Sequence, residues 1–267
     1  MPLPDFIIAG VQKCGTTALQ RVLRRHPEIY MPGRELHFFD KRRGPTSRYT
    51  SRFKSGQING EKTPIYVAIP QVMVHIARVM PDVGIVLVLR DPVLRFASGC
   101  AHRNRRRKGR NFTPLRKFID SQEGMMALWR GMYAQQVDHV LQLFDRVKIV
   151  FSEQMRSDPV TVVHDVQEFL GCRKRHDLGA RPAGADRHIG NASVRQRLID
   201  FYRNHNLRLV RLLPWAEEHV AKWSGMNGLL RKDEDVSPGI GMLETGRKTG
   251  AQQVGDTEDI REQVSAV

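Results

Sequence analysis

Cysteine is scarce in this chain of 267 residues, which contains only Cys14, Cys100 and Cys172. An odd number of cysteines without metal-ligand spacing argues against a disulfide framework and against a zinc site, so a reducing compartment and no metal are expected. No apolar run is long enough to span a bilayer. The first strand is expected to begin near Asp5, which leaves no room for a signal peptide. These absences predict a soluble, cytoplasmic protein without a membrane span.

Acidic residues are outnumbered by basic ones, 28 to 43, which gives a formal net charge of +15. This excess favours anionic ligands such as phosphosulfate, acidic glycans or nucleic acids. A basic run at residues 103–110 is either a solvated surface or a site that attracts an anionic acceptor. Nucleic acid is the least favoured ligand, because no aromatic residues interleave the run and no recognisable nucleic-acid module surrounds it.

Apolar runs alternate with helical patterns along most of the chain. Strands are expected near residues 5–10, 57–61, 83–89 and 147–151, and helices near 16–26, 68–79, 92–105, 113–145, 159–170 and 194–213. This alternation predicts an α/β protein with a single-domain, P-loop-like fold, in which a central parallel sheet is flanked by helices. The domain is expected to cover residues 1–230, and residues 231–267 read as a largely disordered tail.

An anion-binding loop is expected after the first strand, between Gly10 and Thr17. Its glycines allow tight turns, and the N-terminus of the next helix directs amide groups and partial positive charge toward a phosphate. The P-loop frame G-x-x-x-x-G-K-[ST] fits at Gly10 and Gly15, but Thr16 replaces the usual lysine, and Lys13 lies inside the loop instead. The pattern therefore predicts a phosphate cradle for a nucleotide whose transferred group needs no metal clamp.

A second phosphate-binding segment is expected after the strand at residues 83–89. Arg90 lies at the carboxyl end of that strand, and Asp91 and Pro92 open a helix that carries Ser98 two turns later. A guanidinium fork and a hydroxyl can hold a phosphate together. Open parallel sheets bind ligands at this edge.

These two segments occur in order with two others, Glu-Leu-His-Phe-Phe-Asp at residues 35–40 and Glu-Lys-Thr-Pro-Ile-Tyr at 61–66. With these motifs the chain resembles the sulfotransferases that use 3′-phosphoadenosine 5′-phosphosulfate (PAPS), above all the heparan sulfate type, over residues 4–159. The resemblance implies in-line sulfuryl transfer from PAPS to a hydroxyl of a glycan, glycolipid or secondary metabolite, with a glutamate as base.

The resemblance also implies roles for individual residues. Glu35 is the general base, Lys13 stabilises the leaving phosphate and Lys62 is a second cation. His37 either orients Glu35, contacts the acceptor, or packs against the two phenylalanines that follow it. The implied cofactor-binding residues are Lys13, Cys14, Gly15, Thr16 and Thr17 for the 5′-phosphosulfate, and Arg90, Ser98 and Arg187 for the 3′-phosphate. Cys14 either fills space in the loop or carries a thiol of lowered pKa.

Two alternatives to a sulfotransferase stay open. A P-loop kinase is suggested by Asp91, which follows a buried strand like a magnesium-binding carboxylate, but the missing lysine after Gly15 and the intervening Arg90 argue against it. A non-catalytic basic adaptor would keep the fold without turnover. The chain also lacks the paired cysteines and the Lys-Gly-Arg segment of the heparan sulfate enzymes and has residues 185–193 in their place, so the acceptor is not inferred from them.

Overall fold

The computed structural model describes residues 2–41, 44–106, 114–177, 179 and 189–230. Within them, five strands form one parallel sheet in the order β2-β3-β1-β4-β5. The strands are β1 (Phe6–Gly10), β2 (Ile29–Tyr30), β3 (Ile58–Lys62), β4 (Gly84–Leu89) and β5 (Val147–Phe151). The predicted central parallel sheet is confirmed. Strand β2 was not predicted, because two residues leave no periodic pattern.

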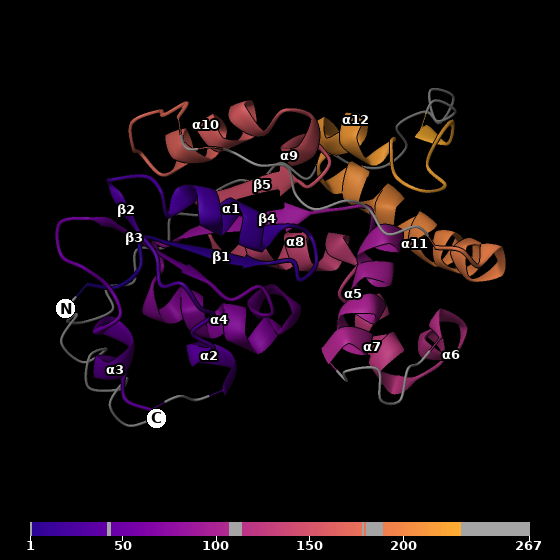
Figure 1. The fold of residues 1–267 in the computed structure, drawn as a ribbon, viewed down its shortest axis with the longest axis horizontal. Coiled ribbons are helices and arrows are strands. Elements are labelled where there is room, and N and C mark those ends of the chain that lie inside the picture. The colour runs from indigo at the N-terminus through magenta and orange to yellow at the C-terminus, as the bar shows by residue number, and fades with distance from the viewer. Residues whose placement is uncertain (1, 42–43, 107–113, 178, 180–188, 231–267) are drawn as a thin grey trace, which may run out of the picture.

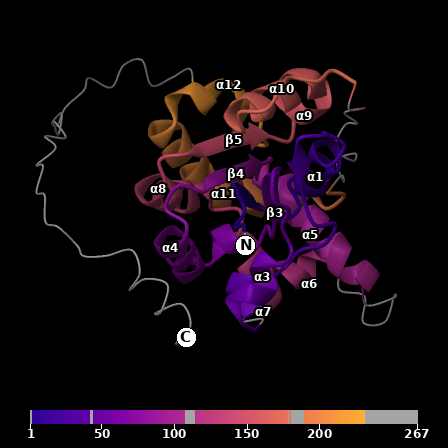
Figure 2. The same cartoon turned by 90° about the vertical axis from the view of Figure 1, so that its left-hand side faces the viewer.

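Helices cover both faces of the sheet (Figure 1). One face carries α1 (Thr16–Leu23), α9 (Gln154–Ser157) and α10 (Pro159–Phe169), and the other carries α4 (Pro70–Val79) and α8 (Tyr133–Leu143). The turned view in Figure 2 also places the strands between α10 and α4. Strands β1 and β4 are buried along their whole length, as expected for a parallel sheet covered on both sides.

The remaining helices lie around this sheet and the helices that cover it. They are α2 (Phe38–Lys41), α3 (Thr46–Thr50), η1 (Tyr66–Ala68), α5 (Pro92–Arg106), α6 (Leu115–Ile119), α7 (Gln122–Trp129), α11 (Ala192–Leu212), η2 (Pro214–Ala216) and α12 (Glu217–Val220). None of the described helices combines the length and the apolar character that crossing a bilayer requires.

Two predicted helices differ from the structure at their boundaries. The expected helix at residues 16–26 ends at Leu23 as α1, because Pro27 disfavours a helical His26 and the His26 ring accepts the Glu28 N–H instead (3.2 Å). The helical region expected at 113–145 contains α6, α7 and α8. There Ser121 starts a new helix, since its hydroxyl accepts the N–H of Gly124 (3.1 Å).

Close packing between β1 and β3 predicts a cost for enlarging Gly60. A Cβ atom there would lie 2.2 Å from the fully buried ring of Phe6, so Gly60→Ala should lower the free energy of unfolding by about 1–3 kcal/mol. Gly99→Ala is the matched control, because Gly99 lies in α5 with nothing within 4 Å of the added carbon and alanine favours a helix. Urea denaturation measures both, and equal stability of the two variants would contradict this packing argument.

Candidate active site

The loop between β1 and α1 presents helix amides at the carboxyl edge of the sheet. Gly15, the N-cap of α1, has φ 105°, and Lys13 has φ 72°, so both residues adopt the left-handed conformation that lets the loop turn. Because Gly15 has no side chain, no side-chain cap occupies the first amides of α1. The turn between β1 and α1 thus leads into a helix N-terminus without a side-chain cap, as a phosphate cradle would require.

The sheet order places this loop at a point where the chain changes direction across the sheet. Strand β1 lies between β3 and β4, and the chain adds β2 and β3 on one side before it adds β4 and β5 on the other. Ligands of open α/β sheets bind at the carboxyl ends of strands beside such a point. Lys62 ends β3 and Arg90 follows β4, so both cations flank the loop.

Arg90 is buried beneath the loop and tied to it. Its Nη1 donates to the carbonyl oxygen of Lys13 (3.1 Å), and its own carbonyl accepts the hydroxyl of Tyr133 (2.8 Å). Tyr133 also lies 3.6 Å from Sγ of Cys14. Burial raises the pKa of the Cys14 thiol to about 12, so the alternative of a thiol with lowered pKa is wrong. Because Cys14 is fully buried in the core, its thiol does not face a ligand.

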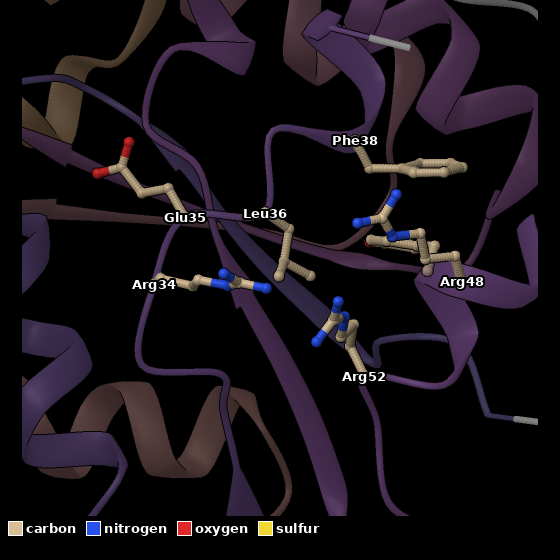
Figure 3. A pocket seen from close by; sticks show the side chains of 7 residues that line it. Arg34, Glu35, Leu36, Phe38, Arg48 and Arg52 are labelled. Atoms are coloured by element: carbon tan, nitrogen blue, oxygen red, sulfur yellow. The ribbon is translucent and has the colours of Figure 1, made fainter. Parts of the chain in front are cut away.

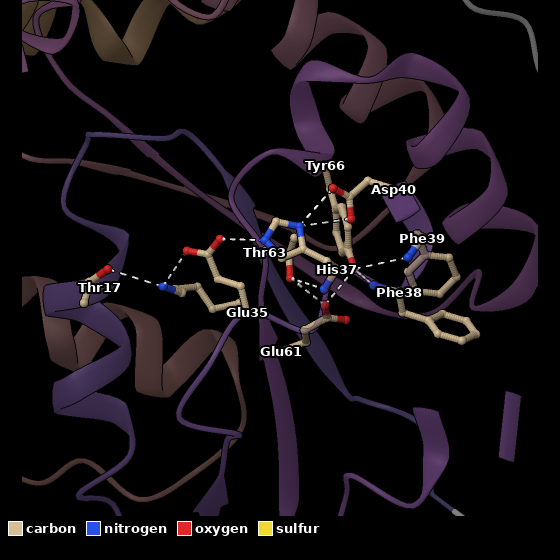
Figure 4. A network of polar contacts seen from close by, with 10 residues as sticks. Thr17, Glu35, His37, Phe38, Phe39, Asp40, Glu61, Thr63 and Tyr66 are labelled. Atoms are coloured by element: carbon tan, nitrogen blue, oxygen red, sulfur yellow. Dashed lines mark hydrogen bonds and ion pairs between the residues drawn. The ribbon is translucent and has the colours of Figure 1, made fainter. Parts of the chain in front are cut away.

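Four of the predicted site residues lie together near the first turn of α1 (Figure 4). Nζ of Lys62 donates to Oε1 of Glu35 (3.0 Å) and to the hydroxyl of Thr17 (3.3 Å). The other carboxylate oxygen, Oε2 of Glu35, lies 3.2 Å from Nε2 of His37. The Lys62 side chain is 6% exposed and that of Glu35 is 34% exposed. Glu35 is thus fixed at both oxygens and still open to solvent.

Asp40 extends this network and was not among the predicted site residues. Its Oδ2 lies 2.9 Å from Nδ1 of His37, and its side chain is nearly buried. His37 therefore bridges Asp40 and Glu35, one on each ring nitrogen. The available signal was the spacing of Asp40 three residues after His37 within the segment at 35–40.

Glu61 lies beneath this network as a fully buried carboxyl. Its Oε1 accepts the hydroxyls of Thr63 and Tyr66, both at 2.8 Å, and its Oε2 accepts the hydroxyl of Tyr49. Burial raises the pKa of Glu61, while these three donors act in the opposite direction. Glu61 belongs to a recognised segment, but nothing in its sequence context distinguishes a buried acceptor from an exposed carboxylate.

Two of these hydroxyls connect Glu61 to the segment that carries Glu35. The oxygen of Tyr66 accepts the main-chain N–H of Phe38 (2.9 Å), and the oxygen of Thr63 accepts that of His37 (3.4 Å). His37 has φ 54°, a left-handed conformation that a non-glycine residue adopts only when its surroundings hold it there. The buried carboxyl therefore anchors the turn of the segment at residues 35–40.

Helix α5 brings a further histidine toward the site. Burial lowers the pKa of His102, the cations of Lys13 and Arg105 lower it further, and Glu35 raises it. The charges of Lys13 and Glu35 are therefore near enough to His102 to affect its pKa. The sequence offered only a histidine at the basic end of a helix, which does not single it out.

The other predicted positions are spread around this centre. Thr16 is buried in α1 and Ser98 is half-buried on α5. Arg187 and the end of the basic run, residues 107–110, lie outside the described residues. In the described part of the chain, no group of three or more His, Cys, Asp or Glu side chains is arranged to hold a metal ion.

Asp91, the carboxylate on which the kinase alternative depends, caps a helix. Its Oδ1 accepts the N–H of Val93 (2.8 Å) at the start of α5. Its Oδ2 accepts both the N–H (2.9 Å) and the hydroxyl (2.6 Å) of Ser224. Both carboxylate oxygens are therefore used to hold α5 and the segment after α12 together.

Comparisons with known proteins agree with this fold. The family model of the sulfotransferase domain matches residues 3–180. The chain is 32% identical over 248 residues to human heparan sulfate glucosamine 3-O-sulfotransferase 6, which covers 78% of this chain and 71% of that protein. It is 29% identical over 259 residues to human heparan sulfate glucosamine 3-O-sulfotransferase 3A1, covering 84% of this chain and 63%, less than two thirds, of that relative.

Solved structures show the same architecture. A sulfotransferase from Alicyclobacillus acidocaldarius superposes with a TM-score of 0.67 at 26% identity, covering 80% of this chain and 97% of that one. The sulfotransferase domain from the curacin biosynthetic pathway has a TM-score of 0.52 at 15% identity and so supports the fold alone, over 73% of this chain and 83% of that one.

A parallel sheet with a P-loop-like turn at its carboxyl edge defines a class of proteins that bind phosphorylated ligands. Within that class, the chain belongs to the sulfotransferase domain family and is a sulfotransferase enzyme. The resemblance recognised from the four ordered motifs is confirmed.

Glu61 is expected to make the stability of this fold depend on pH. Because burial raises the folded-state pKa of Glu61 above its unfolded value, the folded state holds the proton more tightly between the two values. The free energy of unfolding of the wild type, relative to Glu61→Gln, should be greatest below about pH 4 and fall as pH rises through the folded-state pKa. Urea denaturation across this range measures the difference.

The exposed Glu217 on α12 supplies the control for that experiment. Glu217→Gln should show no comparable trend, because its carboxylate is solvated in both the folded and the unfolded chain. A wild-type advantage over Glu61→Gln that stays constant across the pH range would mean that Glu61 titrates in the fold as it does in the unfolded chain.

Proposed function

We propose that this sulfotransferase moves a sulfuryl group from PAPS to an acceptor hydroxyl by in-line transfer, with Glu35 as the base. The observation that carries the proposal is the joining of Glu35, Lys62 and Thr17 at the first turn of α1. It puts a carboxylate and a cation beside a donor-rich helix N-terminus. When bound, PAPS supplies the sulfuryl group and leaves as adenosine 3′,5′-bisphosphate.

Glu35 is suited to accept the proton of an acceptor hydroxyl. Lys62 and His37 hold its two oxygens at 3.0 and 3.2 Å, so the carboxylate keeps one orientation, and its partial exposure leaves room for the acceptor. Asp40 fixes the His37 ring through the opposite nitrogen. This supports the orienting role for His37 among the three roles that the sequence left open.

The cations Lys62 and Lys13 are suited to stabilise the negative charge that develops on the leaving phosphate. Lys62 reaches the hydroxyl of Thr17, and Lys13 lies in the turn before α1. A positive group near the bridging oxygen stabilises the transition state more than the ground state. We assign the main chain from Lys13 to Thr17 to the 5′-phosphosulfate, where Thr16 and Cys14 contribute main-chain groups.

The 3′-phosphate is assigned to Arg90 with Ser98 on α5, and Arg187 is proposed as a third contact from outside the described residues. Arg90 directly follows β4, and Ser98 lies further along the chain on α5. The residues present fit a doubly phosphorylated nucleotide, because they supply a helix N-terminus and cations on both sides of it.

We also propose that residues 1–230 form the catalytic domain, while residues 231–267 lie outside the described residues. A cytoplasmic location is proposed from the small and odd number of cysteines in the sequence, which suggests no disulfide framework. The acceptor is proposed to be a glycan, glycolipid or secondary metabolite, by extension from relatives whose names state action on heparan sulfate glucosamine.

Glu35→Gln should lower turnover by about 100-fold or more, because an amide cannot take the acceptor proton. Affinity for adenosine 3′,5′-bisphosphate should stay almost unchanged, since Glu35 is proposed to act on the acceptor hydroxyl and not to bind the nucleotide. Release of the bisphosphate in the presence of an acceptor measures the first quantity, and calorimetry measures the second. Glu217→Gln is the control, and turnover of Glu35→Gln equal to that control would remove Glu35 as the base.

Arg90→Ala should weaken binding of adenosine 3′,5′-bisphosphate by about tenfold or more, because a charge-assisted hydrogen bond to phosphate is lost. Arg78→Ala makes the same change of charge at an exposed position on α4 and should bind as the wild type does. Calorimetric titrations at two salt concentrations separate this local effect from screening. Equal affinity of the two variants would refute the phosphate assignment.

ATP with magnesium is the competing ligand in the same titration. Selective binding of the bisphosphate supports the sulfotransferase site as proposed. Binding of magnesium-ATP alone would mean that the loop serves a different nucleotide.

A further inference from the structure

Helices α6 and α7 lie at the far end of α5, away from the sheet (Figure 1). They pack with α5 and with the first half of α11 around a second apolar core, to which Phe96, Phe118, Ala127 and Leu198 belong. This core is separate from the one that contains the strands. Residues 115–129 are called the α6–α7 hairpin.

The outer face of α7 is apolar. Gly124 and Ala127 are buried against the second core. With 3.6 residues per turn, the opposite face of this helix carries Met125, Met126 and Trp129. Met125 is 64% exposed, Met126 is 49% exposed and Trp129 is half-buried. A surface helix usually turns polar side chains outward, so this apolar outer face indicates contact with an apolar partner.

Cations lie on the helices around this face. Arg105 and Arg106 are exposed at the end of α5, and Arg116 and Lys117 are exposed on α6. Among the residues that the structure describes, none of these four cations forms an ion pair with a carboxylate. The apolar face therefore lies in a positively charged part of the surface.

The two acids of the hairpin are engaged elsewhere. Asp120 pairs with Arg197 of α11 at 2.7 Å, and Glu123 pairs with Arg103 of α5. These ion pairs tie the hairpin to its neighbouring helices. The exposed cations therefore keep their charge, which attracts an anionic partner.

Charge and apolar character together select the partner. A second copy of the chain would bring the same cations face to face in a symmetric dimer, where they would repel one another. A small soluble anion would contact the cations and leave the methionines in water. A bilayer that contains anionic lipids supplies phosphate groups for the cations and an apolar layer for Met125 and Met126. Tryptophan is favoured at the same interface, which suits Trp129.

We propose that the α6–α7 hairpin and the end of α5 bind the surface of an anionic lipid bilayer. The outer face of α7 enters the interfacial layer, and the four cations contact lipid phosphate groups. Because few apolar side chains are buried in this way, the binding is peripheral and reversible. The proposal goes beyond the proposed function and does not depend on which nucleotide or acceptor the enzyme uses.

Co-sedimentation of the full chain with vesicles tests this surface. The vesicles contain either phosphatidylcholine alone or equimolar phosphatidylglycerol and phosphatidylcholine. We expect the wild type to bind the anionic vesicles at least about tenfold more tightly than the neutral ones. The affinity for anionic vesicles should fall as the salt concentration rises, because salt screens the attraction.

The apolar contribution is tested by Met125→Ser/Met126→Ser, which should weaken binding to anionic vesicles by about tenfold or more. Leu141→Ser/Val160→Ser is the matched control, because it removes two apolar side chains that are 41% and 42% exposed on α8 and α10. This control should bind as the wild type does. Circular dichroism and thermal melting confirm that each variant is folded.

The charge contribution is tested by Arg116→Ala/Lys117→Ala, which should lose about tenfold in affinity for anionic vesicles. Arg78→Ala/Lys222→Ala makes the same change of net charge at exposed positions on α4 and after α12. It should lose less than about twofold, since only long-range attraction is altered.

Several results would overturn the proposal. They are no measurable binding to anionic vesicles, equal affinity for the two kinds of vesicle, or equal losses in a hairpin variant and its control. Unchanged binding by Met125→Ser/Met126→Ser would also overturn it, because the cations alone would then carry the binding. Self-association that this variant abolishes, without binding to vesicles, would assign the apolar face to a second copy of the chain instead.

Discussion

The hydrogen bonds that Glu61 accepts from three hydroxyl groups hold the segment at residues 35–40 against the sheet. Through Tyr66 and Thr63 the buried carboxyl reaches the main chain of Phe38 and His37, and through Tyr49 it reaches helix α3. A buried carboxyl is costly unless its hydrogen bonds are made. The position of the proposed base therefore depends on this anchor.

Electrostatic order around Glu35 follows from this anchored turn. Arg34 faces a pocket of about 160 Å³ on one side of the segment (Figure 3), while the carboxylate of Glu35 faces Lys62 and His37 on the other. Neighbouring residues thus present opposite charges to two different spaces. In a looser turn, Arg34 could form an ion pair with Glu35 and neutralise it. The rigid backbone therefore keeps the guanidinium and the carboxylate of these neighbouring residues apart.

The sequence predicted the sheet well where strands are long and buried. Strands β1, β4 and β5 lie within about a residue of their expected bounds, because parallel strands covered on both faces leave continuous apolar runs. The motifs also singled out Lys13, Glu35 and Lys62, but not the contact between Glu35 and Lys62. Asp40 and Glu61 were not singled out, because a charged residue carries no local mark of what it meets across the fold.

Sequence alone determined that the chain builds an α/β sheet, since apolar periodicity is a local property of the sequence. The resemblance of four ordered motifs identified the sulfotransferase family. Tertiary structure decided which polar groups meet. It placed Lys62 from β3 over the first turn of α1, buried Asp91 as a cap and Cys14 in the core, and brought Arg48 and Arg52 beside Arg34. The reason is that such contacts depend on how distant segments pack, which no local pattern encodes.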